Sequence, residues 1–297
     1  MSDLPQTVSL TERHPESALN RHWMWQSAVL ILVIGWLYSA IIYQLVAQWW
    51  SDPNFSHGFF VPAFSGFVLW QNRKRLVRLP LAPSRWGLLI IAFALIVLVV
   101  GVLGAELFLS RISLLLLIAG LVIFFLGWRV FRAVLFPWAF LILMIPVPAI
   151  LFNQITFPLQ ILASKVAATV LPWLGVPVLR EGNIINLPAM PLAVAEACSG
   201  IRSLLSLTTL TIIYGYLLEP RIWARIVLAL ASIPIAVAAN SFRIVGTGLV
   251  VQYWDPDKAE GFFHVFSGWL IFVISLIMLF LLHQVFSVAR TSEDERP

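Results

Sequence analysis

Long apolar runs separated by short polar loops dominate this sequence, and they constrain its fold more than any other feature. A helix needs about 20 apolar residues to cross the hydrocarbon core of a bilayer. Eight runs approach or reach this length, at residues 24–48, 59–71, 86–107, 112–128, 134–152, 198–218, 226–250 and 264–285. With 60% hydrophobic and only 11% charged residues, the composition excludes a soluble domain. We therefore predict an all-α polytopic membrane protein with about eight transmembrane helices.

The distribution of basic residues predicts how these helices cross the membrane. If the N-terminus is cytoplasmic, the inner loops hold 13 of the 19 lysines and arginines, with the densest cluster at residues 73–78. Because cytoplasmic loops are enriched in these residues, we expect both termini inside. The second run, 59–71, is short and contains Pro62, so its full crossing stays open. The basic residues are spread over several loops, so no nucleic-acid partner is expected.

The domain organisation follows from the same runs. We expect a cytoplasmic N-terminal tail at 1–23, a single transmembrane domain at 24–289 and a cytoplasmic C-terminal tail at 290–297. Pro146 and Pro148 break the fifth span near its outer end. Between spans five and six, residues 155–171 are predicted to form a small amphipathic helix near the outer interface. Residues 176–187 are predicted to form a short hairpin that turns at residues 181–183.

The only cysteine of the chain, Cys198, lies where a polar segment leads into the run 198–218. A lone cysteine in a membrane helix is more often a packing residue than a catalyst, so its surroundings must decide between the two. The thiolate is the reactive form, and a helix N-terminus followed one turn later by Arg202 favours it. Glu196 either orients a base or is a plain charge at the helix N-terminus. Cys198 is thus a candidate nucleophile, with Glu196 and Arg202 as candidate supporting residues.

Two further residues are predicted to lie at the membrane depth of Cys198. Arg243 lies roughly 26 Å along the outward span 226–250, just below the outer edge of a core about 30 Å thick. His264 begins the last span at its outer end. An arginine inside a span costs about 2.5–3.5 kcal/mol on insertion scales and by default indicates a functional site. The alternative is that Arg243 snorkels to the interface or braces a neighbouring helix.

Three other side chains bear on this candidate site. Asn240 precedes Arg243 by three residues and therefore shares its helix face. His57, in the segment Ser-His-Gly at 56–58, lies on the same predicted side and rivals His264 as a base. His283 falls at the inner end of its span and is not expected to contribute. The cysteine and histidines are too few and too dispersed for a zinc site, so no metal and no organic cofactor is expected.

The three principal residue types suit acyl transfer. A histidine can remove the proton of a thiol and return it to a leaving amine. A fixed guanidinium can stabilise the oxyanion that forms when a thiolate attacks a carbonyl group. The sequence therefore predicts one site at the outer membrane surface. In it Cys198 and Arg243 meet a histidine, which is either His264 or His57.

Five stretches give the chain a family resemblance. They read SDPNFSHGFFVP at 51–62, VPVLREGNIINLP at 176–188, AEACSGIRSL at 195–204, NSFRIVGTG at 240–248 and FHVFSGWLIF at 263–272. In these stretches the chain resembles the exosortase/archaeosortase family of membrane proteins, on the exosortase side. The Cys, Arg and His motifs follow one another in the family's order, and the resemblance covers most of the chain from Trp50 onwards.

The resemblance implies a cysteine peptidase or transpeptidase of the bacterial inner membrane, with its active site facing the periplasm. Its expected partners are exported proteins with a PEP-CTERM type sorting signal: a Pro-Glu-Pro motif, a transmembrane helix and a basic cluster. Cys198 would be the nucleophile, His264 the acid and base, and Arg243 the transition-state stabiliser. The thioacyl-enzyme would pass its acyl group to an amine acceptor or to water. Such systems accompany exopolysaccharide production.

Two other functions compete with this one. A membrane acyltransferase could use the same thiol on a lipid-linked donor. A non-enzymatic subunit of exopolysaccharide export would use Arg243 only structurally. Replacing Cys198 separates the enzymes from the export subunit, and the mass of a trapped adduct separates a peptide from an acyl lipid.

Overall fold

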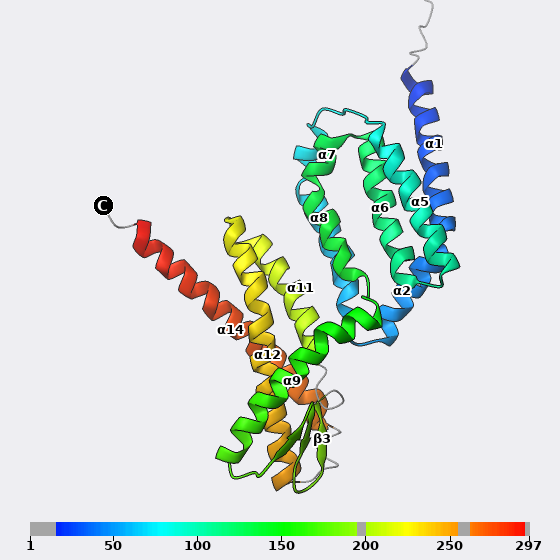
Figure 1. Cartoon of the computed structure of the whole chain (residues 1–297). Coiled ribbons are helices and arrows are strands. Elements are labelled where there is room, and N and C mark those ends of the chain that lie inside the picture. Colours follow the sequence, from blue (N-terminus) through cyan, green and yellow to red (C-terminus); the bar gives the residue numbers. More distant parts are fainter. Residues whose placement is uncertain (1–15, 195–199, 255–261, 295–297) are drawn as a thin grey trace, which may run out of the picture. The chain divides into compact units, whose positions relative to one another are not determined.

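The computed structural model describes residues 16–194, 200–254 and 262–294 and is predominantly helical (Figure 1). Its contacts divide the chain into two compact units, residues 1–44 and 45–297. The first unit contains α1 (Glu16–Leu37) and the beginning of α2 (Ser39–Ser51). The axes of residues 28–37 and of α2 differ by 61°, and together they have the length and composition of one broken span. This bent pair corresponds to the expected run 24–48.

The part of the second unit that precedes residue 145 consists of short helices and one long antiparallel pair. Its elements are η1 (Ser56–Phe59), α3 (Phe60–Gln71), α4 (Arg73–Val77), α5 (Trp86–Leu103), α6 (Leu107–Phe125), α7 (Trp128–Ala133), α8 (Leu135–Phe140) and η2 (Leu141–Met144). Helices α5 and α6 approach closely at Gly87. A Cβ atom there would stand only 2.6 Å from the carbonyl oxygen of Gly120. Small residues allow such close backbone packing between membrane helices.

The region after α8 differs from the expectation. The predicted span 134–152 is not one continuous helix, because α8 and η2 end at Met144 and residues 145–148 are not helical, which confirms the predicted break at its outer end. Pro146 and Pro148 explain this break, since proline also disfavours helical geometry in the residue before it. Helix α9 (Ala149–Trp173) then continues through the predicted amphipathic helix 155–171. With 25 residues it is long and apolar enough to cross a membrane.

The predicted hairpin is confirmed, and a third strand extends it. Strands β1 (Leu179–Glu181), β2 (Ile184–Asn186) and β3 (Pro191–Ala193) form an antiparallel sheet in the order β1-β2-β3. The turn uses Gly182 at φ +65°, a conformation that glycine adopts without steric cost. Leu192 and Val194 are buried in a core with residues of α9 and α12. This core fixes the sheet against the two helices.

Three long helices complete the second unit: α11 (Gly200–Leu218), α12 (Ile222–Tyr253) and α14 (Phe262–Asp294). Helix α12 packs against α9, α11 and α14, and α11 also packs against α14 (Figure 1). Within the described residues, five helices are long and apolar enough to span a membrane, or six if the bent pair is one span. The structure therefore agrees with an all-α polytopic membrane fold, while the count of eight crossings stays a prediction.

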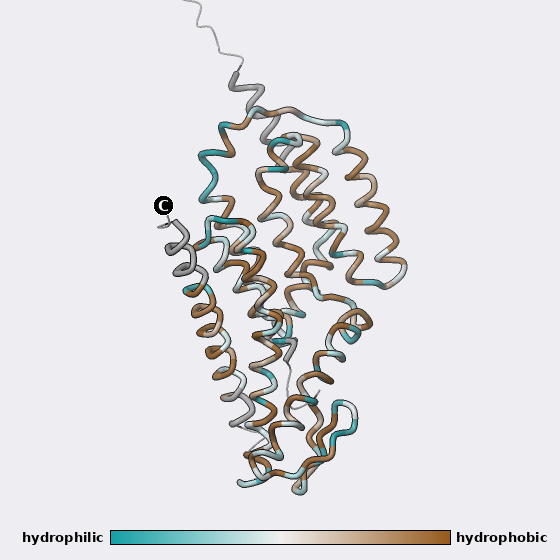
Figure 2. Tube along the Cα trace, turned by 60° about the vertical axis from the view of Figure 1, so that its left-hand side comes forward, coloured by the Kyte–Doolittle hydropathy of each residue, from teal (hydrophilic) through white to brown (hydrophobic). Residues whose placement is uncertain are grey.

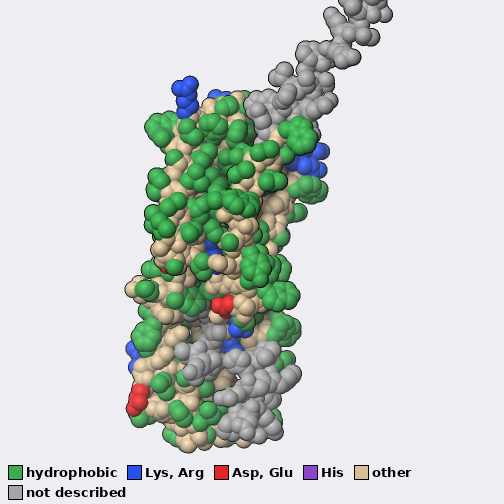
Figure 3. All heavy atoms as spheres, turned by 90° about the vertical axis from the view of Figure 1, so that its right-hand side faces the viewer, with side chains coloured by type: hydrophobic (Ala, Val, Ile, Leu, Met, Phe, Trp, Pro, Cys, Tyr) green, Lys and Arg blue, Asp and Glu red, His purple; other side chains and the backbone are tan. Residues whose placement is uncertain are grey.

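The surface of the long helices is suited to lipid. Figure 2 shows hydrophobic residues along nearly their whole length, and Figure 3 shows hydrophobic side chains over most of the face in view. Helix α5 exposes Leu88, Phe93, Ile96 and Val99, each by more than half of its surface. A helix that is apolar on all sides and exposed in this way requires a hydrocarbon environment.

Candidate functional site

Arg243 lies inside the helix bundle rather than at its surface. It is 6% exposed in the second half of α12. Its guanidinium nitrogens lie 3.6 Å from the position that a Cβ atom at Gly268 would occupy on α14. Because glycine has no side chain, α14 leaves room for the guanidinium at this point. The snorkelling alternative does not fit this burial, whereas a fixed position between helices does.

The same contact relates Arg243 to the position of His264. Residue 264 lies in the first turn of α14, four residues before Gly268, so both positions share one helix face. The side chain of His264 is outside the described part of the structure. The packing of α12 against α14 therefore brings Arg243 to the helix face, within one turn, on which the sequence places the candidate base.

The sequence places the candidate nucleophile immediately before α11. Cys198 and Glu196 lie in residues 195–199, outside the described residues. Helix α11 begins at Gly200 and packs against both α12 and α14. Arg202, in its first turn, is exposed. The three helices that carry Cys198, Arg243 and His264 in the sequence prediction thus pack against one another.

Asn240 is also buried, at 7% exposure, on the face of α12 that carries Arg243. Its neighbour Ser241 is only 3% exposed, and its hydroxyl donates a 2.9 Å hydrogen bond to the carbonyl of Val237. The burial of Asn240 agrees with a role beside Arg243.

His57 occupies a separate buried position in η1, which packs against α3, η2 and α11. Its Nε2 lies 3.2 Å from the carbonyl oxygen of Leu143, and its Nδ1 has no hydrogen-bond partner among the described residues. Burial lowers the pKa of His57, and the backbone carbonyls of Leu143 and Asn54 oppose this shift. The imidazole is therefore neutral at pH 7, and a tautomer that donates from Nε2 leaves Nδ1 able to accept a proton.

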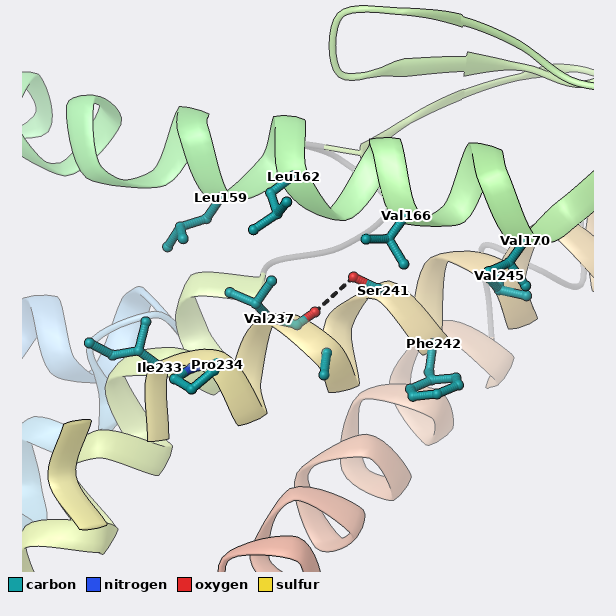
Figure 4. A pocket seen from close by; sticks show the side chains of 11 residues that line it. Leu159, Leu162, Val166, Val170, Ile233, Pro234, Val237, Ser241, Phe242 and Val245 are labelled. Atoms are coloured by element: carbon teal, nitrogen blue, oxygen red, sulfur yellow. Dashed lines mark hydrogen bonds between the residues drawn. The ribbon is translucent and has the colours of Figure 1, made fainter. Parts of the chain in front are cut away.

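A cavity of about 480 Å³ lies between α9 and α12, on another face of α12 (Figure 4). Its lining is apolar except for Ser241, whose hydroxyl already bonds to Val237. Leu162 and Val166 of α9 point toward Val237 and Ser241 of α12 across this space, and Val170 lies beside Val245. The cavity offers no group for peptide chemistry, so we place the candidate reaction beside Arg243 instead.

Sequence reasoning missed a buried polar network at the end of these helices that lies away from Arg243. The Glu219 side chain, 1% exposed, lies 3.3 Å from Nε2 of His283. Nδ1 of His283 lies 2.7 Å from the Tyr214 hydroxyl. About 20 helical residues, roughly 30 Å at 1.5 Å per residue, separate this network from Arg243 along α12. This network joins α11 and α14 far from the candidate site. The sequence signal for it is Glu219, a charged residue in the link between α11 and α12.

A second buried arginine was also not foreseen. Arg111 of α6 is 3% exposed, and its Nη1 donates a 2.8 Å hydrogen bond to the side-chain oxygen of Gln48. This bond joins α2 to α6.

Within residues 16–194, 200–254 and 262–294, no three histidine, cysteine, aspartate or glutamate side chains are grouped closely enough to hold a metal ion.

Comparison with known proteins adds one finding to this geometry. A family model described as transmembrane exosortase matches residues 49–281, which is more than three quarters of the 297 residues. The matched region begins in α2 and ends within α14, and so includes every candidate site residue. No curated protein and no solved structure gives a significant match.

Proposed function

The chain belongs to the transmembrane exosortase family, and from this membership we propose that it is a membrane-embedded cysteine peptidase or transpeptidase. Its substrates are exported proteins that end in a PEP-CTERM type sorting signal. The apolar helices and the family indicate a multi-pass membrane protein. Within this proposal the membrane is the bacterial inner membrane, and the outer ends of α11, α12 and α14 face the periplasm.

Each principal residue has one role in the proposed reaction. Cys198 is the nucleophile, His264 is the acid and base, and Arg243 stabilises the oxyanion. His57 is the alternative base, because burial lowers its pKa and keeps the imidazole neutral at pH 7. Asn240, Glu196 and Arg202 are supporting residues.

The proposed reaction proceeds in two balanced steps. The imidazole takes the thiol proton, and the sulfur forms a bond to the carbonyl carbon of the scissile peptide. The tetrahedral oxyanion collapses, the carbon–nitrogen bond breaks, and the leaving amine receives the proton from the imidazolium. An amine acceptor or water then attacks the thioester carbonyl while the imidazole takes its proton. The carbon–sulfur bond breaks, and the imidazolium returns the proton to the sulfur, so that the thiol is regenerated.

One observation carries this proposal beyond family membership. The guanidinium of Arg243 is held at the α12–α14 interface, 3.6 Å from the Cβ position at Gly268. A charge fixed in a site from which water is excluded stabilises a developing oxyanion much better than a charge in water.

Co-expression with an exported protein that carries the full sorting signal tests the proposal. The intact mass of the recovered protein identifies its new C-terminus. We expect shortening with the wild-type chain and none with Cys198→Ala, at equal amounts of both in the membrane. Shortening that persists in Cys198→Ala would exclude the cysteine mechanism. A lipid adduct on Cys198 in place of a peptide would favour the acyltransferase.

A further inference from the structure

The edge of the small sheet that leads to Cys198 carries unpaired backbone groups. Leu187 N–H donates to the Met190 carbonyl at 3.3 Å, and Val194 N–H donates to the Asn183 carbonyl at 3.0 Å. In an antiparallel pair, hydrogen-bonded residues alternate with residues whose backbone groups face away. The register pairs Ile184 with Ala193, so Ala193 is one of those facing away.

Ala193 therefore directs both its N–H and its C=O away from β2. Within the described ranges, no hydrogen bond engages either group. Pro191 is the other residue of β3 in this orientation. It is exposed and, as a proline, has no backbone N–H to donate. Helix α9 packs against β1 and β2, while β3 is the outer strand on the other side of the sheet (Figure 1).

The position of this edge is fixed, and it leads directly to the candidate nucleophile. Leu192 is 6% exposed and Val194 is fully buried, so the inner face of β3 is anchored in the core formed with α9 and α12. Cys198 lies only five positions after Ala193, a distance of at most about 17 Å in an extended chain. A peptide paired with Ala193 would therefore lie within a few residues of the thiol.

We propose that the extended segment before the membrane helix of the sorting signal binds by strand addition to the free edge of β3. This inference rests on the proposed function, which supplies the substrate. Added strands gain affinity from backbone hydrogen bonds, and a substrate residue paired with Ala193 exchanges two such bonds with it.

A Pro-Glu-Pro motif matches this edge. Its glutamate has an N–H and a C=O that pair with the C=O and N–H of Ala193. Both flanking prolines then fall at positions that face away from β3, where the lack of an N–H costs no hydrogen bond. An interior position of a sheet would not tolerate two prolines in this spacing, whereas a single hydrogen-bonded pair at an edge does.

The test measures binding of a fluorescent peptide to the full-length Cys198→Ala protein in lipid nanodiscs. The peptide contains the Pro-Glu-Pro segment and the following apolar helix. Ala193→Pro removes the outward N–H donor and disturbs the geometry of the edge. The lost hydrogen bond should weaken peptide binding about tenfold or more. Ala193→Ser keeps the N–H and should bind normally. Arg180→Pro, which removes an outward N–H from β1 at the opposite edge, should also bind normally.

A second measurement does not depend on folding of the proline variant. A peptide methylated on the glutamate nitrogen should bind the Cys198→Ala protein about tenfold more weakly than the unmethylated peptide. Equal binding of the two peptides, or of correctly folded Ala193→Pro and Ala193→Ser, would overturn strand addition while leaving the proposed function intact. Failure of the unmodified peptide to bind at all would refute the proposed substrate, and strand addition with it.

Discussion

The guanidinium of Arg243 on α12 lies 3.6 Å from the place where a side chain at Gly268 on α14 would begin. This relationship joins two motifs that are 25 residues apart in the sequence. It means that the space for the buried charge is provided by the absence of a side chain, one helical turn from His264.

Substitutions at residue 268 should act through Arg243. In Gly268→Ala the new Cβ makes ordinary van der Waals contact with the guanidinium, so substrate processing should be nearly unchanged. Gly268→Leu needs the space that the guanidinium occupies, and a displacement of about 1 Å can lower the rate 10²-fold. The rate of signal cleavage measures the effect. Gly246→Leu is the control, since Gly246 is exposed and no atom lies within 4 Å of its Cβ position. Equal activity of both leucine variants would remove the proposed role of this contact.

Arg243→Lys tests the chemical role of the guanidinium. Lysine keeps the charge but lacks the planar fork that binds an oxyanion through two N–H groups. We expect cleavage to slow by about 10²–10³-fold, the usual effect of removing one oxyanion donor. Single-turnover cleavage with reconstituted protein is the measurement. A lysine variant that cleaves at the wild-type rate would assign Arg243 a role only as a charge.

His57 should make stability depend on pH. Burial lowers its pKa in the folded protein, so the folded state favours the neutral imidazole while the unfolded chain takes up a proton below about pH 6.5. The stability that His57 contributes is therefore complete above that pH and is lost as the pH falls through the folded pKa. Thermal unfolding in detergent between pH 7.5 and 5 should show a smaller loss for His57→Gln than for the wild type. Parallel pH curves for the two proteins would contradict this assignment.

The network of Glu219, His283 and Tyr214 should stabilise the packing of α14 without taking part in the reaction. His283→Ala removes the side chain that lies against the buried Glu219 and the Tyr214 hydroxyl. Losing these two hydrogen bonds should lower the free energy of unfolding by about 1–3 kcal/mol. His283→Gln, which can still donate a hydrogen bond, should lose less. Denaturant unfolding of the two variants measures the difference. Unchanged stability in His283→Ala would show that this network contributes little.

Much of the fold was predictable from local pattern. The runs that became α5 and α6 are almost entirely apolar, and such runs have few alternatives to a membrane helix. The turn at Gly182 was predictable because its residues favour a hairpin. Helix α9 was harder, because Pro158 and Pro172 lie inside it and resemble helix breakers. Proline is tolerated in membrane helices when neighbouring groups satisfy the freed carbonyl.

The candidate site was predictable only in part. Depth along each span placed Arg243 near the start of α14, and the structure places its guanidinium beside that helix. The contact with Gly268 was not predictable, because a glycine carries no signal of what fills the space beside it. The pairing of Glu219 with His283 was missed for a similar reason. Contacts between helices that are distant in sequence depend on their rotation, which one sequence does not reveal.

Capture of the proposed thioester by hydroxylamine tests the central claim most directly. Reconstituted wild-type protein is incubated with the exported substrate and hydroxylamine, and the mass of the shortened product is measured. Because hydroxylamine attacks a thioester to form a hydroxamate, the account predicts a product that ends in a hydroxamate with the wild type and no product with Cys198→Ala. A shortened product from Cys198→Ala, or a wild-type product that never carries the hydroxamate, would contradict it.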